Sequence, residues 1–237
     1  MNPANRSERP TLRQAALIAG IGYLLMPVTI AEFYVFPRLV IPGHIEQTVQ
    51  NIATHGGLFV TAILCYLITF VCDVVIAWAL YILLTPVNKA LSLLTAWFRL
   101  IYAAIALFAL FNLVNAYRIV HTADFLDAFG SQQLHAQVKL LLSTFRYDFS
   151  FSLIIFAIHL VLLGCLIYRS GYIPRLIGIL LILDGLGWII DSLSPYLYPT
   201  AHIGFVAITF LGELVFMLWL LIRGWKIKEP PARIQQP

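Results

Sequence analysis

Five ionisable side chains lie deep inside long apolar runs of this sequence. They are Asp73, Arg99, His159, Asp184 and Glu213. A charge in the hydrocarbon core of a membrane costs several kcal/mol unless it is paired, hydrated or neutralised. Carboxyl and imidazole groups also transfer protons, and a guanidinium group binds anionic ligands. We therefore treat these five as candidate catalytic residues.

The composition predicts that these residues belong to an integral membrane protein. Of the 237 residues, 61% are hydrophobic and 11% are charged, and the mean hydropathy is +0.88. An average soluble domain is about 25% charged, so a soluble fold of this size has too little polar surface. The expected fold is all-α, a polytopic membrane helix bundle.

Six apolar runs approach or exceed the length of about 20 residues that crosses the hydrocarbon core. The first run is too long for a signal peptide and no cleavage site follows it, so we expect it to be retained. The chain then divides into a polar N-terminus (1–13), a six-helix transmembrane domain (14–224) and a polar tail (225–237). The six runs are Gln14–Phe36, Leu58–Leu84, Leu91–Tyr117, Phe149–Tyr168, Ile173–Leu193 and Ile203–Gly224.

The basic residues predict the orientation. Six spans place both termini on one side, and with the N-terminus inside, the cytoplasmic segments hold ten Lys and Arg against four outside. Arg99, within a span, completes the total of fifteen. Because cytoplasmic loops are enriched in Lys and Arg, we expect a cell (inner or plasma) membrane protein with both termini in the cytoplasm.

Two longer connections then lie outside. In Pro37–Gly57, the segment HIEQTVQNIATH predicts a short surface helix. In Arg118–Asp148, Ser131 is a candidate N-cap before a stripe of apolar residues at helical spacing. This stripe favours an amphipathic helix lying on the interface or covering the bundle, and an ordinary connector is the alternative.

The five candidate residues share one depth. Each lies roughly 8 to 11 residues from the cytoplasmic end of its span, or about 12–17 Å at 1.5 Å per residue. Because three carboxyl groups face one arginine and one histidine, we expect at least one carboxyl to be protonated at neutral pH. An alternative for Asp73 and Arg99 is a structural ion pair between two helices.

Further polar residues predict a funnel that opens outward from this layer. At 100° per residue, Asp148 lies on the helix face of His159, His202 on that of Glu213, and Asp191 on that of Asp184. Glu32 lies near the outer end of the first span. The expected funnel residues are Glu32, Asp148, Asp191 and His202.

A weak internal repeat also relates the second and third spans to the fourth and fifth. A shift of 86 residues places Asp73 on His159 and Lys89 on Arg175. A real repeat would be parallel and would place Asp73 and His159 in equivalent positions. Chance similarity between two apolar hairpins is the alternative.

Several classes of function are disfavoured. The sequence has no GxSxG, HExxH or P-loop motif, and Arg99 opposes a metal ion beside Asp73, His159 and Glu213. Its basic residues form no nucleic-acid-binding patch. Cys65, Cys72 and Cys165 lie in apolar runs without CxxC spacing, which is typical of inert buried thiols. The sequence indicates neither a cofactor nor an oligomeric state.

The segments CDVVIAWALYILLTPVN, FRL, IHLVLLGCLIYRSGYIPRLIGILL, GEL and LWLL resemble a family of bacterial and archaeal six-helix membrane proteins, domain of unknown function DUF4386. The resemblance extends from about Arg13 to Trp225. It implies this fold and topology but no known activity. It also implies shared polar positions, with a departure at Asp184, where a small residue is usual. The shared positions are Asp73, Arg99, His159, Asp191 and Glu213.

Three hypotheses of function remain. The favoured one is a buried acidic site that binds an apolar or amphiphilic ligand. It includes an intramembrane enzyme acting on a lipid or isoprenoid, with Glu213 or Asp184 as acid, Asp73 and Arg99 as an orienting pair, and His159 as base. A carrier of protons or a small cation is the second hypothesis, although the spans show no glycine-rich break. A structural or accessory subunit is the third.

Overall fold

The computed structural model describes residues 10–122, 130–197 and 211–227, and within these ranges every regular element is a helix. The chain divides into two compact units. Unit 1 comprises Met1–Leu24, Asp73–Leu100 and Ile154–Pro237. Unit 2 comprises Leu25–Cys72 and Ile101–Leu153.

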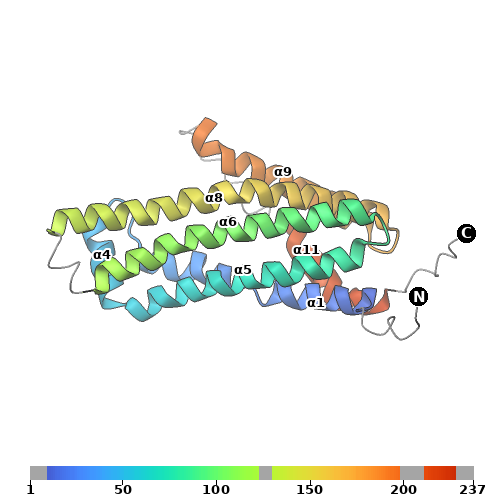
Figure 1. The fold of residues 1–237 in the computed structure, drawn as a ribbon, viewed down its shortest axis with the longest axis horizontal. Helices are drawn as coiled ribbons and strands as arrows, with labels where there is room; N and C mark the ends of the chain where they lie inside the picture. The colour runs from blue at the N-terminus through green and yellow to red at the C-terminus, as the bar shows by residue number, and fades with distance from the viewer. Residues whose placement is uncertain (1–9, 123–129, 198–210, 228–237) are drawn as a thin grey trace, which may run out of the picture. The chain divides into compact units, whose positions relative to one another are not determined.

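Three long helices contribute one part to each unit. They are α5 (Gly56–Leu84), α6 (Lys89–His121) and α8 (Ser131–Ser170), all uninterrupted (Figure 1). In the described residues, five helical segments are long and apolar enough to cross a membrane. They are these three helices, Leu12–Leu39 and Arg175–Ser194. The all-α prediction is confirmed. The sixth expected span lies partly outside the described residues.

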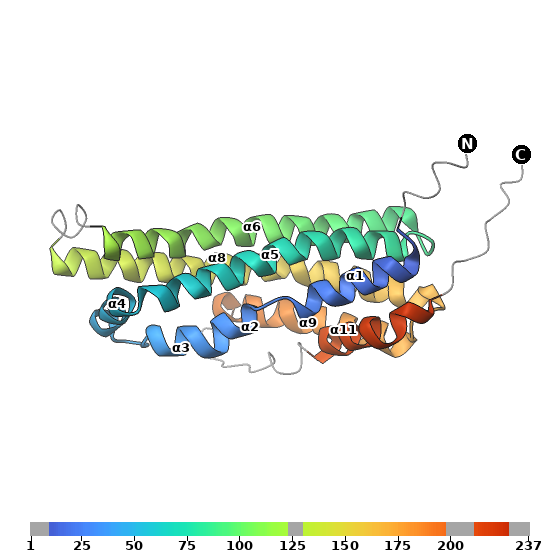
Figure 2. The ribbon, with the colours of Figure 1, turned by 90° about the horizontal axis from the view of Figure 1, so that it is seen from below.

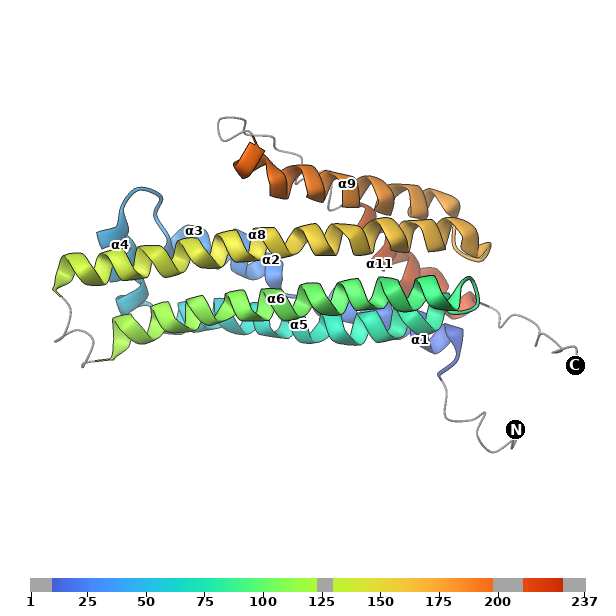
Figure 3. The same ribbon diagram turned by 45° about the horizontal axis from the view of Figure 1, so that its top comes forward.

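Unit 1 also contains α1 (Leu12–Leu24), α9 (Arg175–Leu197), α11 (Leu211–Arg223) and the short η3 (Gly224–Lys226). α11 packs against α1 and α9, and α9 runs beside the C-terminal part of α8 (Figure 3). A Cβ atom added to Gly178 would lie 2.7 Å from the carbonyl oxygen of Gly164. These glycines therefore let the backbones of α8 and α9 approach closely.

Unit 2 also contains α2 (Val28–Ile30), the π-helical η2 (Ala31–Val35), α3 (Phe36–Leu39) and α4 (Ile45–Thr54). The short helix expected in the first connection is confirmed as α4. A hydrogen bond connects α4 to the end of α3, because Asn51 Nδ2 donates to the carbonyl of Leu39 at 3.2 Å. The Thr48 hydroxyl accepts from the N–H of Ile41 at 3.0 Å.

The first apolar run is not one continuous helix. Its helical structure is interrupted at residues 25–27, between α1 and α2 (Figure 2). The break ends at Pro27. Proline has no N–H to donate to the carbonyl of Tyr23, four residues earlier, and its ring crowds that carbonyl. Leu12–Leu39 still counts as one candidate span, and its helix is broken at this proline.

The second connection also differs from expectation. A helix does begin at Ser131, but it continues without a break into the fourth apolar run as α8. No glycine or proline occurs between Ser131 and Gly164, so nothing in the sequence stops it. At 1.5 Å per residue its 40 residues extend about 60 Å. The apolar stripe of Leu134, Val138 and Phe145 is buried, so it packs inside the protein.

Candidate functional site

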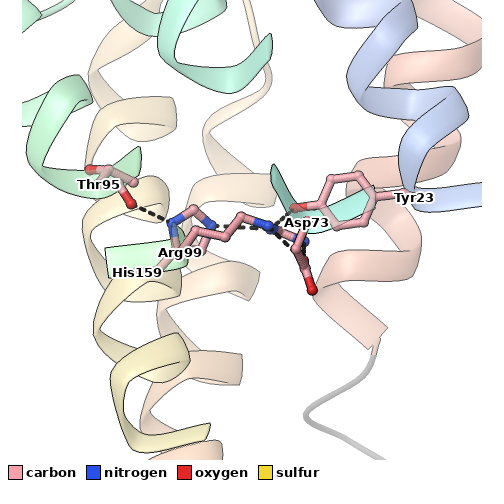
Figure 4. Close-up of polar contacts among 5 residues, drawn as sticks. All are labelled: Tyr23, Asp73, Thr95, Arg99 and His159. Carbon is pink, nitrogen blue, oxygen red and sulfur yellow. Dashed lines mark hydrogen bonds and ion pairs between the residues drawn. The ribbon is translucent and has the colours of Figure 1, made fainter. Parts of the chain in front are cut away.

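Arg99, on α6, is the centre of a polar cluster in unit 1, and its exposed fraction is 0%. Its Nε donates to Oδ1 of Asp73, on α5, at 2.9 Å, and its Nη2 lies 2.6 Å from the same oxygen (Figure 4). Both side chains of this ion pair are fully buried. Two guanidinium nitrogens therefore share one carboxylate oxygen, rather than binding the two oxygens side by side as in a bidentate pair.

Tyr23 and His159 complete the surroundings of Arg99. Arg99 Nη1 donates to the Tyr23 hydroxyl at 2.8 Å and lies 3.2 Å from His159 Nε2. His159 Nδ1 lies 2.8 Å from the carbonyl oxygen of Thr95. Because a carbonyl only accepts, Nδ1 carries the ring hydrogen and Nε2 accepts from Arg99. His159 is therefore neutral in this arrangement, and its lone pair is already engaged.

Two aromatic rings also face the guanidinium. The Arg99 Cζ atom lies 4.9 Å from the ring centroid of Tyr23 and 5.3 Å from that of Phe156. Cation–π attraction at these distances adds to the ion pair. The cluster thus connects α1, α5, α6 and α8, and the charges of Asp73 and Arg99 compensate each other.

The second carboxylate oxygen of Asp73 takes part in none of these contacts. Oδ2 is buried and has no hydrogen-bond partner among the described residues. Most buried polar atoms in proteins are hydrogen-bonded, and each exception needs an explanation. This oxygen is therefore a candidate contact point for a ligand.

Glu213 lies in the first turn of α11 and is half-buried. Its carboxyl interacts electrostatically with Arg99, Asp184 and Asp73. In the part of the chain that the structure describes, this carboxyl forms no hydrogen bond or ion pair. Glu213 thus adds a second acceptor group near the Asp73–Arg99 pair.

Asp184, on α9, is placed differently. Its Oδ2 accepts from the backbone N–H of Glu213 at 3.0 Å, and its carboxyl also accepts from the N–H of Gly212. A carboxylate at these N–H groups accepts hydrogen bonds from donors that lack partners within the helix. Its negative charge also interacts favourably with the positive end of the helix dipole. A Cβ atom at Gly212 would collide with the Asp184 carboxyl. Asp184 therefore caps α11, and its carboxyl is already engaged.

Two of the expected funnel residues belong to unit 2. Glu32 Oε1 accepts from the Tyr66 hydroxyl, and Oε2 accepts from Arg146 Nη1 at 2.9 Å. Asp148 is exposed, and its Oδ2 lies 3.4 Å from Asn112 Nδ2. Glu32 is therefore engaged in an ion pair of its own.

The other two expected funnel residues are less informative. Asp191 is half-buried on α9, and His202 lies outside the described residues. Sequence reasoning missed the roles of Tyr23, Tyr66 and Arg146. The two tyrosines carry no charge that would mark them within an apolar run, and Arg146 was counted only for orientation.

No group of three or more His, Cys, Asp and Glu side chains in the described ranges is arranged to hold a metal ion. The internal repeat stays a prediction, and the two residues it relates, Asp73 and His159, both contact Arg99.

The sequence pattern of the family described as Domain of unknown function (DUF4386) matches residues 18–224. The chain belongs to this family. It is also 34% identical over 186 residues to an uncharacterised protein from Archaeoglobus fulgidus, a match that covers 78% of this chain and 91% of the relative. No solved structure matches the chain. The DUF4386 match contains the whole Arg99 cluster and Glu213, while the family description assigns no activity to them.

Proposed function

We propose that this DUF4386 protein binds an amphiphile whose head group is positively charged or donates hydrogen bonds. The head group would contact Asp73 and Glu213, and the apolar part would lie among the surrounding helices. One observation carries this proposal, namely that Asp73 Oδ2 is buried and has no hydrogen-bond partner in the described part of the chain. A donor brought by a ligand would remove the cost of that buried acceptor.

The charges near this oxygen favour the same class of head group. Arg99 is compensated by Asp73, and His159 is neutral through its bond to Thr95. Asp184 is engaged by backbone N–H groups. Among these groups Glu213 is the carboxyl that has no hydrogen bond or ion pair with the described residues, and a cation or a proton would compensate its charge.

The geometry also bears on an acid–base role. In an intramembrane enzyme acting on a lipid or isoprenoid, Glu213 and Asp73 would exchange protons with the substrate. His159 would hold Arg99 in place, because its Nε2 lone pair is engaged. This assignment departs from the expectation that His159 is the base.

The test is native mass spectrometry with lipid extraction on detergent-purified protein. Wild type would be compared with Asp73→Asn, Glu213→Gln and the control Asp148→Asn, which alters an exposed carboxyl in unit 2. We expect a compound with a basic or hydrogen-bond-donating head group on wild type and the control, and its loss from the other two variants. The same lipids on all four proteins would contradict the proposal.

A carrier of protons or a small cation is the second candidate. Its support is the helix break at residues 25–27, which begins two residues after Tyr23, a member of the Arg99 cluster. Interrupted membrane helices form the substrate and ion sites of many secondary transporters. In proteoliposomes under an imposed gradient, this candidate requires a flux that Glu213→Gln abolishes, and the absence of flux in wild type would eliminate it.

We further propose six spans in the cell membrane with both termini in the cytoplasm. The five candidate spans and the apolar run Ile203–Gly224 support this number. The excess of basic residues in the segments assigned to the cytoplasm supports the orientation. Reporter fusions at each terminus that register the outer side would overturn the assignment.

A further inference from the structure

A cavity of about 200 Å³ lies in unit 2, between the region of α3 and α8. Its walls are mostly apolar, and two aromatic rings face each other there, with the centroids of Phe36 and Phe145 at 6.1 Å. The Phe145 ring also packs edge-on against Tyr66 at 5.1 Å. Such packed rings give the cavity a rigid apolar wall. The lining residues are Phe36, Val40, Leu142, Ser143, Phe145 and Arg146.

A cationic group lies on this cavity. Arg146 has a side-chain exposed fraction of 53%, and its guanidinium lies 5.0 Å from the ring centroid of Phe36. Its Nη1 donates to Glu32, while a guanidinium has five N–H donors in all. Donors thus remain for a further acceptor, and a guanidinium suits the oxygens of a phosphate.

Two more polar residues share this side of α8. Ser143 lines the cavity and is exposed, and Lys139 is exposed one turn before it. Spacings of four and seven residues keep Lys139, Ser143 and Arg146 on one face of the helix. Together they offer two positive charges and a hydroxyl beside an apolar cavity.

Glu32 positions Arg146 at this cavity. It lies in the π-helical turn η2, a rare geometry that occurs frequently at functional sites. Its two carboxyl oxygens accept from Tyr66 and from Arg146. Glu32 therefore holds the Arg146 side chain in position. The charges of Arg146, Lys139 and Glu32 sum to one positive charge.

We propose that this cavity binds an acyl chain of an anionic phospholipid, with the lipid phosphate on Arg146 and Ser143. The apolar wall fits the chain, and the positive excess fits the phosphate. A protein with helices that could span a membrane would meet such lipids at high concentration. This site is in unit 2 and does not depend on the function proposed for unit 1.

The test is lipid titration in detergent, followed by native mass spectrometry. We expect wild type to bind phosphatidylglycerol more tightly than phosphatidylcholine. Arg146→Gln should weaken phosphatidylglycerol binding about tenfold or more, the size of a lost charge-assisted hydrogen bond. The matched control Arg118→Gln changes an exposed arginine of unit 2 that does not line the cavity, and should leave binding unchanged.

Two further variants separate lipid binding from folding. Val40→Phe fills the cavity while retaining Arg146, and should also weaken phosphatidylglycerol binding. Glu32→Gln removes the ion-pair partner that positions Arg146, and should weaken that binding less than Arg146→Gln, because Arg146 keeps its charge and its contact with Phe36. Equal affinity of wild type for the two lipids would overturn the proposal, as would a Val40→Phe protein that binds phosphatidylglycerol like wild type.

Discussion

In the described residues the two units each contain one Arg–carboxylate ion pair, and the two pairs differ in almost every respect except their chemistry. Asp73–Arg99 in unit 1 has an exposed fraction of 0% for both side chains. Glu32–Arg146 in unit 2 has exposed fractions of 23% and 53%. Burial, and not the identity of the charged groups, therefore sets what each pair requires from its neighbours.

The buried pair requires partners from several helices. Arg99 contacts the Tyr23 hydroxyl and His159 as well as Asp73, because no water shell replaces a missing partner at full burial. The exposed pair has solvent at Arg146, the Phe36 ring beside its guanidinium, and the Tyr66 hydroxyl bonded to Glu32. This comparison predicts large mutational effects in unit 1 and small ones in unit 2.

The largest effect is expected from breaking the buried pair on one side only. Arg99→Met or Asp73→Asn should each lower the free energy of unfolding by about 3–5 kcal/mol, because the remaining charge loses its partner. The double variant should lose less than either single change. Chemical unfolding in detergent measures these differences, with Arg118→Gln as an exposed control. A cost below about 1 kcal/mol for Arg99→Met would mean that the buried pair stabilises the fold no more than an exposed pair does, which would contradict the comparison.

An intermediate effect is expected at the tyrosine beside each pair. Tyr23→Phe leaves a buried N–H of Arg99 unpaired and should cost about 1–2 kcal/mol. Tyr66→Phe should cost less, because Glu32 keeps Arg146 and is partly exposed to solvent. The same unfolding assay compares the two variants. The reverse order would show that exposure does not govern these hydrogen bonds.

The smallest effect is expected at the exposed pair itself. Glu32→Gln and Arg146→Gln should each change the free energy of unfolding by less than about 1 kcal/mol, and raised salt should reduce this difference further. A loss as large as that of Arg99→Met would contradict the comparison. It would also assign Arg146 a structural role in place of the proposed lipid contact.

Part of the unit 1 site could be predicted because it follows from a hairpin. Asp73 and Arg99 lie on consecutive spans at nearly equal distances from the turn at residues 85–88, and antiparallel neighbours place such residues at one height. Tyr23 lies 76 residues from Arg99, so no local pattern links the two. Its hydroxyl also carries no charge that would mark it within an apolar run.

The carboxyl groups Asp184 and Glu213 mark the limit of the sequence-based argument. Each is an acid at the same depth in an apolar run, and the pattern predicts the same role for both. Only the approach of α11 to α9, which the absent side chain of Gly212 permits, engages Asp184 with backbone N–H groups. Glu213 has no equivalent partner among the described residues. The break after α1 and the full length of α8 were not predicted for a related reason, because hydropathy reports burial, while a proline or its absence decides where a helix stops.

By itself, the sequence determined that this protein is all-helical and built of apolar segments long enough to cross a membrane. These properties depend on composition and on spacing along one segment, and in the described residues the structure has only helices and five candidate spans. The tertiary structure decided which polar groups are satisfied and which remain open, as at Asp73 Oδ2. Hydrogen-bond partners and burial come from elements far apart in the chain, and only their packing brings these together.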